Sequence, residues 1–479
     1  MKFVTLILGL FAFPAIASPA QTFKTVVSFD GSNGSLPLSS LVQGTDGFLY
    51  GTTDEGGAGV AGSVFRVNTQ GKLAALFSFC GDCSNGGFPT AGLVQVLSQG
   101  FYGTTSLGGG TGDAGTAFKI GPAGELTTLY RFCSLRNCAD GTSPLGRLIL
   151  ATDGNLYGTT SGGGANCPGG MGCGTVFELP PSGTMTTLYN FCAQPNCTDG
   201  SNPGAGLVQA TNGSLYGTTV NGGANGQGIV FRITMAGELT VLYSFCSLAG
   251  CVDGMEPSGA LIQGADGNFY GTTFFGGAHK EGTVFKITDE GKLTVLHSFC
   301  SRSGCPDGAN PASELVQATD GLFYGTTSAG ILRGLYKNGN GTVFSISATG
   351  DIRTLHRFDR SDGAGPVGGL VQATNGKFYG TTPIDGPGAD GTIFSVSVGL
   401  GPFVETQPSA GGVGKKVIIL GSNLEGATGV AFKGTPAKFK VVSGSEITTS
   451  VPQGATTGFV NVTTPARKLK SNTVFRVTK

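Results

Sequence analysis

Twelve cysteines are the most reactive side chains of this 479-residue sequence, and they fall into six close pairs. An even number of cysteines in local pairs predicts disulfides in an exported protein. Two alternatives stay open: two pairs would make a four-thiolate metal site if loops from different repeats converge, and "CGDC" at 80–83 resembles a redox motif without a thioredoxin-like context. The predicted disulfides join Cys80 with Cys83, Cys133 with Cys138, Cys167 with Cys173, Cys192 with Cys197, Cys246 with Cys251, and Cys300 with Cys305.

A "DGxxP" pattern follows each x4-spaced cysteine pair, and Asn33 and Asn85 open the same pattern in two further places. A ring of carboxylates around one mouth would suit calcium or sugar hydroxyls. The alternative is an Asx-type turn, with proline directing the chain into the next repeat. The turn is favoured, since all repeats carry the pattern and an active site would break the symmetry. No cofactor is predicted, with Ca²⁺ as the alternative; the candidate aspartates are Asp140, Asp199, Asp253, Asp307 and Asp362.

Few other residues suggest catalysis. His297 and His356 stand where other repeats have tyrosine, which predicts packing roles, and His279 lies alone in a loop. No Ser–His–Asp arrangement, HExxH motif or carboxylate pair outside the repeat pattern can be recognised, and the expected central mouth shows only repeated acids. The sequence therefore predicts no catalytic, cofactor-binding or metal-binding residues.

Loops that break the repeat are the better candidates for specific contacts. The longest are 161–174 and 328–341, and the second carries Arg333, Tyr336 and Lys337. The loops at 30–37 and 359–366 lack cysteines and are expected to be neighbours. Long loops on a rigid scaffold are where binding usually resides.

These loops must be positioned by a repeat whose mark is the tetrapeptide "YGTT". It occurs seven times at steps of 52 to 59 residues, a period typical of solenoids, propellers or arrays. The unit that begins at Leu261 contains four strand-like runs, "LIQGA", "NFYGTT", "TVFKIT" and "KLTVLHSF", separated by turns such as "ADGN". Four antiparallel strands per repeat predict the blade of a β-propeller.

The two ends of the repeat region predict how the ring closes. The fourth run occurs six times after "YGTT", and the missing copy is "FKTVVSF" at 23–29. This N-terminal run should pair with "GTIFSVS" at 391–397, completing a seventh blade and leaving no exposed inner edge. The short turns then lie on one face together with both chain exits, and the long loops lie on the other.

The chain termini indicate export and a second domain. Residues 1–20 combine Lys2, an apolar run and small residues, which predicts a signal peptide cleaved after Ala17 or Ala20. No later stretch approaches the length of a membrane span. After a linker at 399–402, residues 403–479 alternate apolar and polar positions in short runs, which predicts a small Ig-like β-sandwich.

Charge separates the two predicted domains. Residues 21–398 carry 18 Lys and Arg against 26 Asp and Glu, whereas the part from Gly399 carries ten against three. The basic sandwich could favour an anionic surface, a polysaccharide or the acidic propeller itself, or it could simply aid solubility. Export argues against nucleic acid as a partner.

Two resemblances follow from these motifs. "LVQATDGxLYGTT…GTVFKI…LTxLYSF", over residues 23–398, resembles the GloVer tandem repeat of exported bacterial proteins. "GKKVIILGSNLEGATGVAFKGTPAKF…VPQGATTGFVNVTTP", over 403–479, resembles an IPT/TIG domain. The first implies a variable C-terminal module for surface attachment, and the second implies an Ig-like spacer or binding unit; neither implies catalytic residues.

The leading hypothesis is a secreted or cell-surface, non-enzymatic binding protein. Its long-loop face would recognise an extracellular glycan or protein, and the sandwich would act as spacer or attachment module. The alternatives are a propeller hydrolase or lyase acting on polysaccharide, and a purely structural surface component. The sequence does not predict an oligomeric state.

Overall fold

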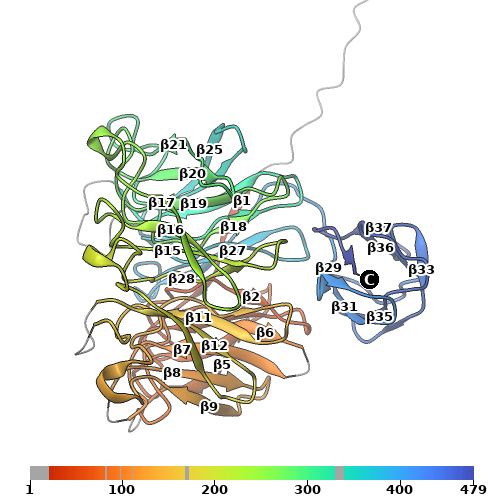
Figure 1. The fold of residues 1–479 in the computed structure, drawn as a ribbon. Coiled ribbons are helices and arrows are strands. Elements are labelled where there is room, and N and C mark those ends of the chain that lie inside the picture. The colour runs from red at the N-terminus through yellow and green to blue at the C-terminus, as the bar shows by residue number, and fades with distance from the viewer. Residues whose placement is uncertain are drawn as a thin grey trace, which may run out of the picture.

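The computed structural model describes residues 21–80, 83–97, 99–110, 112–167, 172–329 and 339–478. The protein is all-β, and its only helical elements in the described ranges are three short 3₁₀ turns, η1 (Arg136–Cys138), η2 (Pro195–Cys197) and η3 (Ala249–Cys251). Figure 1 shows a round body built from the repeats and a smaller body, coloured blue, beside it. We call residues 22–397 the repeat region and residues 403–478 the C-terminal region.

The repeat region contains seven four-stranded antiparallel sheets among its described residues. Each sheet runs from a short first strand to a longer fourth strand. The first strands are β2 (Val42–Gln43), β6 (Val94–Val96), β10 (Ile149–Leu150), β14 (Val208–Gln209), β18 (Ile262–Gln263), β22 (Val316–Gln317) and β26 (Val371–Gln372). The second strands are β3 (Leu49–Thr53), β7 (Gly100–Thr105), β11 (Leu156–Thr160), β15 (Leu215–Thr219), β19 (Phe269–Thr273), β23 (Phe323–Thr327) and β27 (Phe378–Thr382).

The other two strands of each sheet complete the pattern. The third strands are β4 (Ser63–Val67), β8 (Thr116–Ile120), β12 (Thr175–Leu179), β16 (Ile229–Ile233), β20 (Thr283–Ile287), β24 (Thr342–Ile346) and β28 (Thr392–Ser397). The fourth strands are β5 (Leu73–Ser78), β9 (Leu126–Arg131), β13 (Thr186–Asn190), β17 (Leu239–Ser244), β21 (Leu293–Ser298), β25 (Ile352–Arg357) and, from the N-terminus, β1 (Thr22–Ser28).

The expected pairing of the N-terminal strand is confirmed. β1 pairs antiparallel with β28, from Thr22 opposite Ser397 to Ser28 opposite Thr392. Its register skips one residue between Thr25 and Val27, and the other six fourth strands carry a comparable bulge against their third strands. β1 therefore has the same local geometry as the other six fourth strands, because it occupies the fourth-strand position of its sheet.

Seven hydrophobic clusters join the sheets into a closed ring. Each of six clusters combines side chains of two repeats that follow one another in the sequence. The seventh cluster joins the first and last sheets through Phe29, Phe65, Tyr379 and Ile393, all at most 2% exposed. Burial of apolar surface between every pair of neighbours stabilises the ring without any free edge in its interior.

Contacts with the third strand and with the next sheet explain the "YGTT" motif. A Cβ on its glycine would lie 2.6–2.8 Å from a third-strand phenylalanine ring, as Gly217 shows against Phe231. In six repeats the first threonine donates a hydrogen bond to a carbonyl at the start of the next sheet; Thr159, for example, bonds Ala205 O at 2.9 Å. The motif is thus a structural requirement of the ring.

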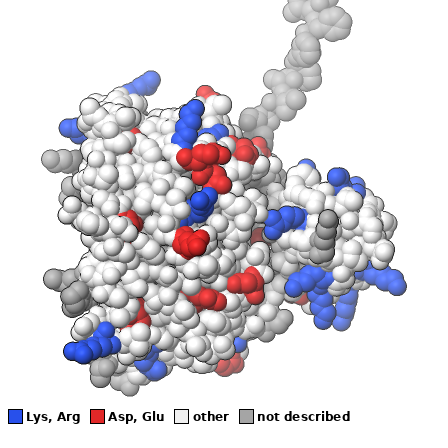
Figure 2. Space-filling view, in the orientation of Figure 1, with Lys and Arg blue, Asp and Glu red and all other residues white. Residues whose placement is uncertain are grey.

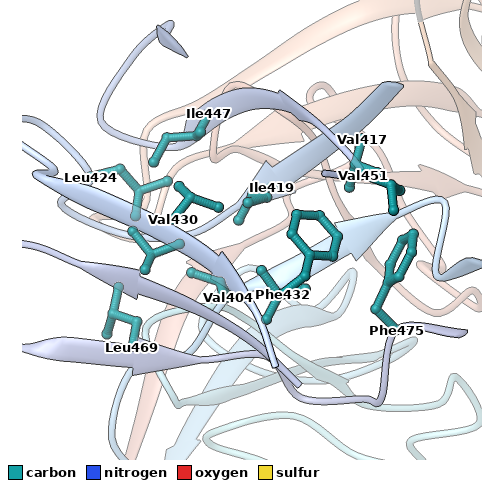
Figure 3. Close-up of a cluster of buried hydrophobic side chains, with 12 residues drawn as sticks. Val404, Val417, Ile419, Leu424, Val430, Phe432, Ile447, Val451, Leu469 and Phe475 are labelled. Carbon is teal, nitrogen blue, oxygen red and sulfur yellow. The ribbon is translucent and has the colours of Figure 1, made fainter. Parts of the chain in front are cut away.

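The C-terminal region has its own core and two four-stranded sheets, in the orders β29-β31-β35-β34 and β33-β32-β36-β37, plus the parallel pair β30-β38. Figure 3 shows the side chains between the sheets, among them Ile419, Phe432 and Phe475, which are at most 1% exposed. The strands are β29 (Glu405–Gln407), β30 (Ala410–Gly411), β31 (Lys416–Leu420), β32 (Gly429–Phe432), β33 (Thr435–Ala437), β34 (Phe439–Val441), β35 (Glu446–Ser450), β36 (Val460–Thr463), β37 (Lys468–Lys470) and β38 (Arg476–Val477).

The C-terminal region contacts the turns between first and second strands. Ser445 Oγ donates to Thr45 O at 2.8 Å, and Arg476 Nη1 donates to Thr211 O at 2.9 Å. Thr374 bonds Ser422 by side chain at 2.8 Å. These turns define the short-turn face, so the opposite, long-loop face is left uncovered by this region, as expected.

Candidate functional site

Disulfides close the loops on the long-loop face, and all six predicted pairs are present. The bonded pairs are Cys80 with Cys83, Cys133 with Cys138, Cys167 with Cys173, Cys192 with Cys197, Cys246 with Cys251, and Cys300 with Cys305. No free cysteine occurs in the described ranges, so the "CGDC" pair of Cys80 and Cys83 is bonded like the others. Such a set of disulfides is typical of a secreted or extracellular protein.

The six disulfides also contradict the alternative in which cysteines from different loops form a metal site. The sulfurs of Cys167, Cys173 and Cys192 lie within 4.8 Å of one another. Because all three belong to disulfides, they offer no thiolate to a metal ion.

Among the described residues no helix is long and apolar enough to cross a membrane.

The candidate aspartates point into their own loops. Asp140 is fully buried; its carboxylate accepts hydrogen bonds from the Tyr130 hydroxyl at 2.8 Å and from the backbone N–H groups of Ser134 and Leu135. Burial, followed by the hydrogen bond and the negative charge of Asp140, raises the pKa of Tyr130 to about 12, an increase that Ser134 opposes. The carboxylate thus satisfies backbone N–H groups five and six residues before it in its own loop, whereas the expected Asx-type turn would bond a group two residues after it.

The other aspartates of this set also bond a ring group of the preceding strand, although the buried Oδ1 of Asp307 has no hydrogen-bond partner among the described residues. Asp199 and Asp253 accept hydrogen bonds from Tyr189 and Tyr243, each at 2.8 Å. In the following repeats histidine takes the tyrosine's place: His297 lies 2.9 Å from Asp307, and His356 lies 2.6 Å from Asp362. Burial lowers the pKa of His356, against the opposing effect of Asp362. Within the described ranges, none of these aspartates belongs to a group that could hold a metal ion.

The remaining candidates, Arg333, Tyr336 and Lys337, lie outside the described residues.

The loops closed by disulfides carry exposed aliphatic residues. Leu135 and Leu248 are the residues that precede η1 and η3, and their side chains are 56% and 54% exposed. Val252, in the same loop as Leu248, is 40% exposed. Leu248 and Val252 thus place two exposed aliphatic residues on one loop, and contiguous exposed apolar surface, unlike a single exposed leucine, marks contact sites.

The centre of the ring contains a charged pair that the sequence did not reveal. Three consecutive residues from each repeat line a cavity of about 120 Å³. Across it, Arg147 Nη2 lies 3.3 Å from Glu314 Oε2, and Ser40 Oγ donates to Glu314 Oε1 at 2.9 Å. We call this cavity the central channel and these three residues the channel plug.

The expectation that the mouth holds only repeated acids is therefore wrong. Glu314 stands directly before the leucine of its repeat, where the other repeats have Ser40, Gly92, Arg147, Gly206, Ala260 and Gly369. Aligning the seven copies at that leucine would have found it. Its carboxylate is occupied by Arg147 and Ser40, and the cavity holds only a few water-sized molecules.

A second unrepeated acid, Asp54, follows the first "YGTT", where other repeats have Ser, Val, Phe or Pro. Burial, with a smaller effect of the neighbouring Glu55 charge, raises the pKa of Asp54 to about 6. Its Oδ1 is buried and has no hydrogen-bond partner among the described residues. Perturbed carboxyl groups occur at functional sites and at structural ones.

Comparison with solved structures gives only distant likenesses. A candidate 6-phosphogluconolactonase of Bacteroides uniformis has 17% identity and a TM-score of 0.44, with 67% of this chain and 84% of that chain covered. A candidate gluconolactonase has 11% identity and a TM-score of 0.38, with 82% and 98% covered. A luciferin-regenerating enzyme has 12% identity and a TM-score of 0.41, with 80% and 98% covered. Likeness this low carries no inference about activity.

Comparison by sequence is more informative. No curated protein matches the chain. The family model of the Gloeobacter/Verrucomicrobia repeat matches it three times, at residues 13–171, 101–252 and 248–407. These matches span the whole repeat region and most of the chain, which confirms the resemblance seen in the repeated motifs. The protein is therefore a member of the Gloeobacter/Verrucomicrobia repeat family.

Proposed function

We propose that this protein is an exported, non-catalytic binding protein whose long-loop face recognises the surface of another extracellular protein. In this proposal residues 1–20 are a signal peptide and 21–398 form a closed seven-bladed β-propeller. Residues 399–402 link it to an IPT/TIG-like, Ig-type sandwich at 403–479, which serves as spacer or attachment module.

The observation that carries the proposal is the construction of the cysteine-closed loops. Leu135 N–H is fixed by Asp140, and Leu135 O accepts from Cys138 N–H within the disulfide loop. Leu248 is held in the same way by Asp253 and Cys251. Such loops lose little conformational entropy on binding.

A protein partner is favoured over a glycan by the chemistry of these tips. Leucine and valine offer apolar contact area, whereas the loop carboxylates that could bond sugar hydroxyls are already used by tyrosine, histidine and backbone groups. Tryptophan, the strongest stacking partner for sugar rings, does not occur in the chain. Glu314 and Asp54, the unrepeated acids described above, are the candidates for a hydrolase, and Glu314 is engaged in the channel plug.

Binding of the labelled, full-length mature protein to intact source cells and to a glycan array tests the proposal. The double variant Leu135→Asp and Leu248→Asp should lose cell binding by about tenfold or more, because a buried charge replaces an apolar contact. The control Val241→Asp changes a 36% exposed aliphatic residue on fourth strand β17, away from the cysteine-closed loops. Equal binding of both variants would refute the proposal.

The array separates the remaining hypotheses. Saturable binding to one glycan that depends on calcium would instead support the aspartate ring. Turnover of a lactone or polysaccharide that is lost in Glu314→Gln or Asp54→Asn would support the hydrolase.

A further inference from the structure

A second site, beyond the function proposed above, lies where the repeats lose their symmetry. In five repeats the glutamine of the first strand accepts a hydrogen bond from a backbone N–H in the turn of the preceding sheet; Gln209, for example, accepts from Thr152 at 2.9 Å. Two adjacent repeats lack this bond. Gln95 Oε1 is buried without a hydrogen-bond partner among the described residues, and Leu150 replaces glutamine and is 38% exposed.

Both exceptions open into one cleft. Gln95, Leu97, Gln99 and Leu150 line it on the side of the repeat region, and residues around β29 and β30 line it on the other side. Its volume is about 880 Å³, at the upper end of ligand pockets in proteins. A buried amide oxygen that lacks a hydrogen-bond donor lowers the stability of the folded protein. The cleft gives a ligand access to the residues around Gln95.

A second cleft of about 1090 Å³ adjoins the first, because Leu97 and Lys416 line both. It follows the outer face of the sheet β29-β31-β35-β34, past Phe439 and Thr448. We call the two clefts together the junction groove. Because the two clefts adjoin, one chain molecule could occupy both.

The groove is positively charged. It is lined by Lys415, Lys416, Lys438, Lys440 and Arg476, against the two carboxylates Glu405 and Glu446. None of the five cations forms an ion pair with a described residue; Arg476 bonds a backbone carbonyl instead. Burial raises the pKa of Glu405, against the opposing effect of a hydrogen bond from Gln407. Figure 2 shows Lys and Arg gathered on the C-terminal body.

We propose that the junction groove binds an extended anionic polysaccharide, of the uronate or sulfated class. Lys416 lies opposite Ser450, and Lys438 directly precedes Phe439, which lies opposite Thr449, so the two lysine backbones stand about two strand spacings apart, roughly 10 Å. Charge-assisted bonds from these cations would hold the acid groups of successive sugars. The side chains of Gln95, Gln407 and Thr448, also in the lining, would bond the hydroxyls.

An acidic peptide is the competing occupant, and the geometry disfavours it. Peptides commonly add a strand to an unpaired sheet edge. The groove runs mostly over a sheet face, on which β31 and β35 are paired on both sides, and it reaches the sheet edges only at β29 and β34. These two edge strands are three residues long each, so they offer a peptide few backbone groups, whereas the charged side chains lie along the groove.

The test measures binding of the full-length mature protein to polygalacturonate, dextran sulfate, neutral dextran and poly-glutamate by isothermal titration at two salt concentrations. The double variant Lys416→Glu and Lys438→Glu reverses two groove charges. The control, Arg467→Glu with Lys468→Glu, makes the same change of net charge at exposed positions on the opposite sheet. Thermal melts of both variants check that the fold is retained.

We expect both anionic polysaccharides to bind, neutral dextran not to bind, and the groove variant to bind about tenfold more weakly or worse, since each lost charged contact is worth about that factor. The control variant should stay within about twofold of the wild type. Equal weakening of the two variants would show non-specific attraction to net charge and overturn the proposal. Absence of polysaccharide binding, or tighter groove-dependent binding of poly-glutamate, would also overturn it. None of these outcomes depends on Leu135 or Leu248, so the long-loop proposal stands or falls separately.

Discussion

The central channel lies inside the repeat region and the junction groove lies beside the C-terminal region, and the two are built in opposite ways. The channel holds about 120 Å³ and is closed by an ion pair and a hydroxyl from three different sheets. The groove holds about 880 and 1090 Å³ in its two parts, and its cations have no ion-pair partner among the described residues. Close packing of seven near-identical sheets leaves little room at the ring centre, so space for a ligand arises where a non-repeated region meets the ring.

The ring and its centre should therefore carry the stability, and removal of β1 is the strongest way to test this. Deleting residues 21–29 removes the fully buried Phe29 and uncovers an edge of β28. We expect a loss of more than about 4 kcal/mol, from the lost aromatic burial and the opened ring. Thermal unfolding followed by far-UV circular dichroism measures it, and a synthetic 21–30 peptide added in excess should restore part of the loss. An unchanged melting temperature would contradict ring closure.

The glycine of "YGTT" gives the next largest effect. In Gly217→Ala the new Cβ would lie 2.6 Å from the Phe231 ring and 2.8 Å from Leu207, so neighbours must shift at a cost of about 1–3 kcal/mol. The control Gly204→Ala meets its nearest atom at 3.8 Å and should be neutral or slightly stabilising. Urea denaturation separates the two; similar midpoints for both variants would show that the motif does not owe its glycine to packing.

The channel plug is the third test. Glu314→Leu leaves Arg147 without its anion, and because Arg147 is partly exposed we expect a loss of only about 1–2 kcal/mol. The double variant Arg147→Leu and Glu314→Leu should recover most of that loss, since no uncompensated charge remains. A double-mutant cycle from chemical denaturation gives the coupling. Additive effects would mean that the pair is incidental to the ring.

Replacing Asp54 should raise the free energy of unfolding, whereas the changes described above should lower it. Its folded pKa of about 6 lies above the ordinary carboxyl value of 3.8, so the folded state keeps a proton that the unfolded state has lost. Stability then falls as pH rises between about 4 and 6 and stays lower above that range. Asp54→Asn should stabilise the protein by about 1 kcal/mol at pH 7, discounted for partial exposure, and by nothing at about pH 3.5. Melting temperatures from acidic to neutral pH check this, and a pH-independent gain would assign the effect to something other than ionisation.

Groove variants should affect stability least. Lys416→Ala and Lys438→Ala remove exposed cations without ion-pair partners, so each should change the free energy of unfolding by less than about 0.5 kcal/mol. Differential scanning calorimetry of the full chain is sufficient. A large loss of stability would show that these lysines help to hold the C-terminal region against the repeat region. The groove would then contribute to stability as the central channel does.

Much of the fold could be predicted from local patterns. The strands and hairpins follow from alternating apolar residues and Asp-Gly turns, and the six disulfides follow from cysteine spacing, because each pair closes a loop of at most seven residues. The β1–β28 pairing joins residues about 370 apart, yet a missing copy of the fourth strand predicted it. Repetition makes such distant contacts readable, since each neighbour repeats a known interface.

The site was less predictable, for a physical reason. The loop aspartates could be seen, but whether they faced a ligand or their own loop depended on tyrosine hydroxyl and histidine ring positions set by the fold. Arg147 and Glu314 lie 167 residues apart and meet only because the ring brings sheets three and six to one axis. Nothing in either local sequence marks them as partners.

The sequence by itself determined the repeat, its strands, the turn chemistry and the disulfides, because these depend on residues near one another in the chain or on a motif copied seven times. Only the tertiary structure decided that the centre is plugged, that Gln95 loses its repeat partner and that unpaired lysines face the turns of the second and third sheets. Those features arise where a unique region docks on a repeated one, as in the bond from Ser445 to Thr45 across 400 residues. Such a contact has no periodic pattern to reveal it, and its geometry exists only once both regions have folded.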